Sequence, residues 1–166
     1  MRKYLLLLMC FVMFSPHCDD RKKQETSGLS NTRKPVTGYQ SQKAVYHFNR
    51  NNLVKTAGGL KNIINHLNAV GDDKSVIIAV FHGEAVGTLK AKPGHPGENK
   101  VVEAIHKRAK VIKKRGVRIK VCQETLKEKK LDYKRDLFEV TGEDLVSSGV
   151  AELSRLQMGG HKYIKP

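Results

Sequence analysis

Short apolar runs alternate along this chain with stretches in which apolar residues recur every three or four positions. The runs at 44–48, 76–81 and 117–121 are typical of strands, and the second is apolar throughout, as in a strand covered on both faces. Helical spacing follows at 53–67 and at 101–112. Because strands alternate with helices, the pattern predicts right-handed crossovers and a mainly parallel sheet.

The last third of the chain carries weaker signals of the same kind. A short polar helix is expected at 123–130, weak strands at 138–141 and 145–146, a last helix at 150–157 and an edge strand at 163–164. The whole pattern predicts an α/β domain. We expect a three-layer sandwich with a mainly parallel sheet of about five strands and helices on both sides.

Two segments depart from this regular pattern. Gly58 and Gly59 lie inside the first expected helix, where each costs about 1 kcal/mol relative to alanine, and close packing against a neighbouring backbone is one explanation. The segment 92–98 is rich in Gly and Pro and is expected to form an irregular loop.

The first 42 residues differ in composition from the rest of the chain. Two basic residues precede an unbroken apolar run at 5–14, which is typical of a signal peptide and too short to span a bilayer comfortably. Cys18 stands where a lipoprotein carries its lipid, although His17 is unlike the small residue expected before such a cysteine. We therefore expect a signal peptide at 1–18, with a lipoprotein type as one alternative, a polar flexible tether at 19–42 and the folded domain at 43–166.

The formal net charge of +15 raises the question of a nucleic-acid partner. Many basic residues, however, alternate with apolar ones along helical segments, and aromatic residues that would stack on bases are scarce there. An exported protein also meets little nucleic acid. We expect no nucleic-acid partner, and a periplasmic or cell-envelope location, with a membrane tether through Cys18 if that cysteine is lipidated.

Cys122 is the only cysteine beyond the first eighteen residues, so the folded domain has no disulfide framework. It stands between the expected strand at 117–121 and the expected polar helix. Backbone N–H groups and the dipole at a helix amino terminus favour a thiolate, which makes Cys122 a candidate nucleophile. Thr125 would add a hydroxyl group to the same site. The simpler alternative is that Cys122 is a buried small apolar residue.

Two histidines are also expected at strand ends. His47 and His82 lie at the ends of the first two expected strands, and the carboxyl ends of parallel strands gather at one edge, so both should lie near Cys122. His82 would support a thiolate by its positive charge, whereas His47 is more simply a strand residue. A metal site needs at least three converging ligands, and we expect neither a metal nor a cofactor. Solvated positions are expected for His66, His106 and His161.

Several segments together resemble the DsrE/DsrF-like family, small α/β proteins associated with sulfur transfer. They are YHFN at 46–49, HG at 82–83, VCQETL at 121–126, and SGVAELSRLQ at 148–157 with YIKP at 163–166. The resemblance covers about 43–166, and the segment at 148–157 is its most specific part. Glu124 stands where many relatives have asparagine, and a carboxylate beside the thiol opposes its ionisation.

The resemblance implies a domain that assembles as a homotrimer or homohexamer and carries sulfur as a persulfide on Cys122. Under this hypothesis the protein is a sulfur carrier, with a sulfurtransferase activity, whose partners are sulfur donor and acceptor proteins or small thiols. The alternative is a non-catalytic oligomeric binding or scaffold protein of the cell envelope with an incidental cysteine. A third hypothesis is a redox-sensing thiol that oxidises to sulfenic acid.

Overall fold

In the computed structural model, which describes residues 37–166, five parallel strands form one sheet. The expected signal peptide, Cys18 and most of the expected tether lie outside the described residues. The order across the sheet is β4-β3-β2-β1-β5. The strands are β1 (Gln42–Phe48), β2 (Ser75–Phe81), β3 (Arg118–Cys122), β4 (Leu145–Val146) and β5 (Lys162–Ile164).

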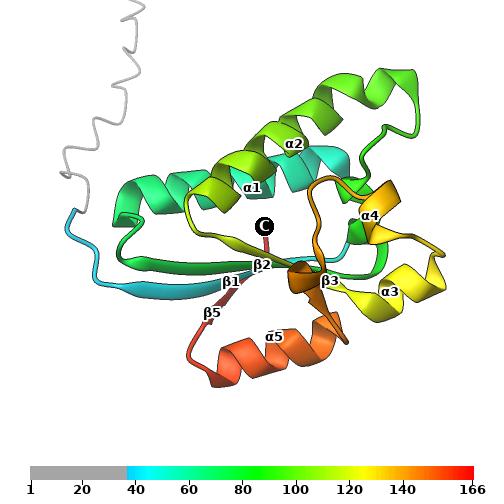
Figure 1. Ribbon diagram of the computed structural model, residues 1–166. Helices are drawn as coiled ribbons and strands as arrows, with labels where there is room; N and C mark the ends of the chain where they lie inside the picture. The colour runs from blue at the N-terminus through cyan, green and yellow to red at the C-terminus, as the bar shows by residue number, and fades with distance from the viewer. Residues whose placement is uncertain (1–36) are drawn as a thin grey trace, which may run out of the picture. The chain divides into compact units, whose positions relative to one another are not determined.

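The helices form the two outer layers of the domain. In Figure 1, α1 and α2 lie above the sheet and α5 lies below it, which confirms the expected three-layer α/β fold. The α-helices are α1 (Leu53–Val70), α2 (Asn99–Lys114), α3 (Gln123–Glu128), α4 (Tyr133–Asp136) and α5 (Gly149–Met158). Three short 3₁₀ segments are η1 (Gly83–Leu89), η2 (Pro96–Glu98) and η3 (Gly142–Asp144).

The period of two along the strands separates two hydrophobic cores. Tyr46 and Phe48 of β1 point into the larger core, which the sheet forms with α1 and α2. Val45, between them in the β1 sequence, belongs to a smaller core with Leu153 and Leu156 of α5. The sheet is therefore covered on both faces, as the apolar run of β2 predicts.

The boundaries of α1 follow from its end residues. The side chain of Asn52 accepts a hydrogen bond from the backbone N–H of Lys55 at 2.9 Å, so it caps the amino terminus of the helix. Gly71 ends the helix with a φ of 98°, which a residue with a side chain rarely adopts. These contacts fix α1 directly after β1 and place its first turn at the carboxyl edge of the sheet.

The two glycines inside α1 have different surroundings. A Cβ atom built on Gly59 would lie 2.6 Å from Phe48 Cε1 and 2.8 Å from Cβ of Pro166, whereas one built on Gly58 meets nothing within 4 Å. Gly59 is therefore needed for close approach, although its neighbours are side chains and not the backbone that the sequence suggested. Nothing in the structure explains Gly58.

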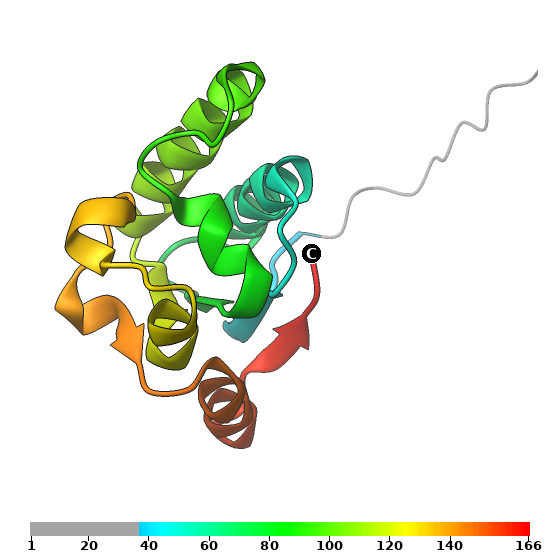
Figure 2. The ribbon, with the colours of Figure 1, turned by 90° about the vertical axis from the view of Figure 1, so that its right-hand side faces the viewer.

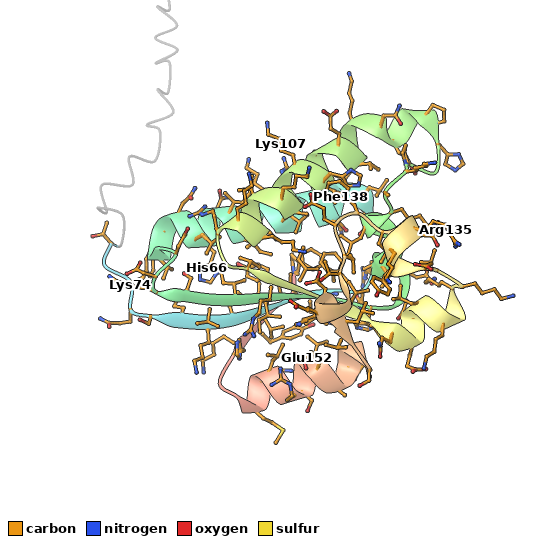
Figure 3. The ribbon with its side chains drawn as sticks, viewed as in Figure 1. His66, Lys74, Lys107, Arg135, Phe138 and Glu152 are labelled. Atoms are coloured by element: carbon orange, nitrogen blue, oxygen red, sulfur yellow. The ribbon has the colours of Figure 1, made fainter. Side chains whose placement is uncertain are left out.

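The expectations for residues 138–141 and for three histidines differ from the structure. Residues 138–141 form no strand; an isolated antiparallel bridge between Lys90 and Leu137 lies just before them. His66 is not simply solvated, because its ring bonds the Tyr46 hydroxyl at 3.0 Å and the side chain of Gln42 at 2.8 Å (Figure 3 labels His66 on α1). His106 and His161 also have protein partners, the carbonyl groups of Lys90 and Leu156.

Candidate functional site

The carboxyl ends of the three central strands lie in register at one edge of the sheet. Phe48 of β1 pairs with Phe81 of β2, and Phe81 pairs with Val121 of β3. His82, which follows β2, and Cys122, the last residue of β3, are therefore neighbours along this edge. This edge of the sheet faces the right-hand side of Figure 1, where α3 and α4 lie. Figure 2 shows the domain from that side.

Cys122 is the last residue of β3 and also the N-cap residue of α3. It is a free thiol, and 5% of the residue is exposed. The structure therefore places Cys122 at the expected edge of the sheet but leaves little of it open to solvent in the single chain.

Two helix amino termini and one hydroxyl group surround the thiol. Burial raises the pKa of Cys122. Hydrogen bonds from the Thr125 hydroxyl and from the backbone N–H groups of Thr125, Gly149 and Glu124 lower this pKa. Together the hydrogen bonds outweigh burial, so the pKa lies below its ordinary value. Gly149 is the first residue of the ten-residue helix α5, so a helix other than α3 also contributes a donor. The site favours the thiolate.

Thr125 connects Cys122 to the end of β2. Its side chain is 5% exposed, and its hydroxyl oxygen accepts a hydrogen bond from the backbone N–H of Gly83 at 2.9 Å. Because that oxygen is already an acceptor, its own hydrogen is free to be donated to the sulfur. Thr125 is thus held in the orientation that supports a thiolate.

Glu124 does not oppose the thiolate in the expected way. Its side chain turns toward Lys127 of the same helix, with 2.8 Å between the carboxylate and ammonium groups, and no charge effect of Glu124 is among the causes that shift the pKa of Cys122. Its backbone N–H is instead one of the donors that stabilise the thiolate.

His82 and His47 form a stacked pair beside the thiol. Their Nε2 atoms are 2.6 Å apart and their rings are 4.7 Å apart with an angle of 12° between the planes. The other ring nitrogen of His47, Nδ1, lies 2.6 Å from the hydroxyl oxygen of Tyr163 in β5. The sequence predicts that the two histidines meet at this edge, but not that Tyr163 joins them.

The expectation that His82 supplies positive charge is not supported. Burial, and then the charge of Lys165, lower the pKa of His82, and burial, Lys165 and His82 lower that of His47 to about 4. Both rings are therefore neutral at pH 7. The lowered pKa of Cys122 comes from hydrogen-bond donors and not from an imidazolium ion.

Gly149 is, like Tyr163, a residue at this site that sequence reasoning missed. A Cβ atom built there would lie 2.6 Å from Cβ of His82 and 3.3 Å from Cβ of Cys122. Only glycine allows α5 to begin so close to both side chains. The serine before it, Ser148, caps α5 by accepting a hydrogen bond from the backbone N–H of Ala151 at 3.3 Å, so the segment SG at 148–149 was an available signal.

Other parts of the described structure carry no comparable chemistry. Among residues 37–166, no group of three or more His, Cys, Asp or Glu side chains is arranged to hold a metal ion. His95, the other loop histidine, is exposed in the segment that leads to α2. None of the helices in this part of the chain is long and apolar enough to cross a membrane.

Fold and site together define a three-layer α/β protein with a thiol at the carboxyl edge of a parallel sheet. The family model of the DsrE/DsrF-like family matches residues 32–166. The chain belongs to this family, and membership suggests a function of the sulfur-relay type.

Comparison with solved structures agrees with the fold. The chain is similar to MTH1491, a protein of unknown function from Methanobacterium thermoautotrophicum, with 25% sequence identity and a TM-score of 0.62; the match covers 75% of this chain and 99% of that one. A search of curated proteins finds no significant match.

Proposed function

We propose that this protein is a sulfur carrier that holds sulfane sulfur as a persulfide on Cys122. The observation that carries the proposal is the set of donors around the thiol: the Thr125 hydroxyl and the backbone N–H groups of Glu124, Thr125 and Gly149. A buried apolar cysteine needs no such donors. Family membership supports the same chemistry.

The reaction consists of two thiolate displacements. In loading, the Cys122 thiolate attacks the outer sulfur of a donor persulfide R–S–SH; the S–S bond of the donor breaks, its electron pair leaves with R–S⁻, and Cys122–S–SH forms. In unloading, an acceptor thiolate attacks the same outer sulfur and the Cys122 thiolate is the leaving group. The donors around Cys122 stabilise the leaving thiolate and so favour release.

The low exposure of Cys122 restricts which molecules can reach it. With 5% of the residue exposed, a broad protein surface cannot touch the sulfur, so transfer needs a narrow thiol group or a displacement of neighbouring side chains. His82 and the start of α5 at Gly149 both lie beside Cys122. We therefore propose small thiols, or cysteines on extended segments of partner proteins, as donor and acceptor.

Transfer of isotope-labelled sulfur tests this function. Wild-type protein should accept labelled sulfane sulfur from a small persulfide donor and pass it to an acceptor thiol, and Cys122→Ser should pass none above the uncatalysed rate. Transfer by Cys122→Ser at the native rate would show that Cys122 is not the carrier.

The alternative, a non-catalytic binding or scaffold protein, has one observation in its favour, which is the low exposure of Cys122. The rate of alkylation separates the two proposals. A thiol-specific reagent should modify Cys122 in the folded protein, at a rate that rises with pH in the range of a lowered pKa. Modification only after unfolding would favour the scaffold.

We further propose that the protein is exported and works as a homotrimer or homohexamer. The basic residues and apolar run at 2–14 support export to the periplasm or cell envelope. Exposed apolar side chains on α5 and β5 support self-association: Val150, Met158 and Tyr163 are 64%, 87% and 45% exposed. Sedimentation of the purified domain gives the oligomeric state.

A further inference from the structure

A small cavity lies beside the histidine pair, between the end of β1, the first turn of α1 and the residues after β5. Its volume is about 30 Å³. Arg50, Lys55, Thr56 and Lys165 line it, and so does His47 of the histidine pair. The cavity therefore adjoins the thiol site through His47 and His82 but does not include Cys122.

In the part of the chain that the structure describes, the basic side chains around the cavity have no acidic side chain as a partner. Among residues 37–166, none of Arg50, Lys55 and Lys165 forms an ion pair with a carboxylate. The ammonium group of Lys165 instead donates to the backbone oxygen of His47 at 3.2 Å and to the side-chain oxygen of Asn49. These neutral acceptors hold the cation in place without neutralising it.

The hydroxyl group of Thr56 is a second, independent feature of this cavity. Thr56 is 2% exposed and lines the cavity. Among residues 37–166, Nε2 of His161 is the one buried side-chain nitrogen or oxygen atom that lacks a hydrogen-bond partner, so the Thr56 hydroxyl is not a sealed, unpaired group. A hydroxyl group that faces a cavity of this size is open to water or to a ligand, and it can donate one hydrogen bond. A ligand atom that accepts this hydrogen bond would help to hold an anion beside Arg50, Lys55 and Lys165.

The titration behaviour of the surrounding groups agrees with an excess of positive charge. Burial, and then the charge of Arg50, lower the pKa of Lys165, and Lys165 in turn lowers the pKa of His47 and His82. No carboxylate appears among the causes of these shifts. An anion in the cavity would reverse the charge effects and restore the balance.

We propose that this cavity binds the carboxylate group of a small anionic thiol that delivers sulfur to Cys122 or removes it. The inference rests on the proposed sulfur-carrier function and names the class of its small-molecule partner. The cavity has room for one carboxylate-sized group and excludes a nucleotide.

The spacing of the strands fits a thiol of tripeptide size. The cavity lies at the end of β1 and Cys122 at the end of β3, and β2 lies between them. Two inter-strand spacings amount to about 10 Å. An extended chain of three residues spans about 10 Å at most, so a thiol of this size has the reach to place a carboxylate in the cavity and its sulfur at Cys122 when the two groups lie near opposite ends of the molecule.

Equilibrium dialysis with radiolabelled sulfate tests the anion site without any sulfur transfer. At constant ionic strength, the full chain should bind one sulfate per cavity, and glutathione should displace it. Arg50→Gln removes an exposed cation that has no partner in the described structure, and it should weaken binding about tenfold, the loss expected for one charged hydrogen bond.

Two further variants control for overall charge. Lys107→Gln makes the same charge change on an exposed side chain of α2 (labelled in Figure 3) and should bind sulfate as the wild type does. Thr56→Val changes no charge and should weaken binding. Equal binding by the wild type, Arg50→Gln and Thr56→Val would show that the cavity is not the site.

The second arm asks whether the anion belongs to a thiol substrate. Glutathione and its dimethyl ester carry the same thiol, but only the first carries free carboxylates. As sulfur acceptor, the ester should have a KM about tenfold higher with wild-type protein, and this difference should disappear in Arg50→Gln. Equal KM values with the wild type would refute the proposed occupant.

The two arms also separate this inference from the proposed function. If Cys122 takes up no sulfur, the carrier function and the thiol assignment both fail, and sulfate binding to Cys122→Ser still decides whether the cavity is an anion site. If sulfur transfer proceeds but sulfate does not bind, the carrier function stands and the anion site is wrong.

Discussion

Thr125→Val removes one thiolate donor while keeping the size and shape of the side chain. The Thr125 hydroxyl donates to Cys122 and accepts from the backbone N–H of Gly83 at 2.9 Å. A hydrogen bond to a charged group contributes about 1.5–3 kcal/mol, so the loss should reduce the thiolate fraction about 10- to 150-fold at a pH well below the pKa.

The observed reaction rate should fall by less than the thiolate fraction. A thiol of higher pKa is a better nucleophile once it is ionised. On a logarithmic scale, this gain in the reactivity of the thiolate offsets nearly half of the loss in thiolate fraction. Alkylation of Cys122 in Thr125→Val should therefore be about 4- to 15-fold slower than in the wild type at a fixed low pH. The midpoint of the pH–rate profile should move to higher pH.

The pH–rate profile with iodoacetamide is the assay, because it separates ionisation from access. Reduced access to a residue that is 5% exposed lowers the plateau at high pH and leaves the midpoint unchanged, whereas a lost donor moves the midpoint to higher pH and raises the plateau. Thr125→Ser is the matched control, since it keeps the hydroxyl, and its midpoint should stay close to that of the wild type. An unchanged midpoint in Thr125→Val would refute the assignment of Thr125 as a thiolate donor.

Three other predictions concern the fold and its pH dependence. Gly59→Ala should lower the free energy of unfolding by about 1–3 kcal/mol, because its Cβ would meet neighbouring atoms at 2.6 Å. Gly58→Ala, where a Cβ meets nothing, should raise the free energy of unfolding by about 0.5–1 kcal/mol. Urea titration measures both values, and equal effects of the two substitutions would contradict the packing around Gly59. Gly149→Ala should push the start of α5 away from Cys122 and slow alkylation at low pH, and alkylation at the native rate would show that α5 contributes no donor. The pKa of His47 is about 4 in the folded protein and 6.5 in the unfolded chain, so the unfolded chain binds more protons between these two pH values. The contribution of His47 to stability should therefore be complete above pH 6.5 and should decrease as the pH drops toward 4. In urea titrations, His47→Asn should weaken this pH dependence.

The sequence predicts the larger elements of the fold well. Apolar periodicity over many residues locates α1, α2 and the three central strands, and even the two-residue strand β4 and the edge strand β5 lie where weak signals suggest. The short segments η1 and α4 were missed because four to seven residues contain too few turns to show a period. Residues 138–141 have strand-like composition, but Phe138 instead stacks on His106 at 3.7 Å between ring centres.

The site was predictable in part for the same reason. Cys122 and His82 follow apolar strands, and parallel topology brings strand ends together, so their meeting at one edge follows from the sequence. The contributions of Tyr163, Lys165 and Gly149 depend on contacts between segments far apart in the chain, which periodicity does not describe. Charge was misjudged at His82 because burial and the nearby Lys165 decide its pKa, and neither is visible in the sequence.

The intact mass of the protein after exposure to a sulfane sulfur donor tests the central claim most directly. The wild type should gain the mass of one sulfur atom, a reductant should remove it, peptide mapping should locate it at Cys122, and Cys122→Ser should gain nothing. An unchanged mass of the folded wild-type protein, or the same gain in Cys122→Ser, would contradict the claim that Cys122 carries sulfur.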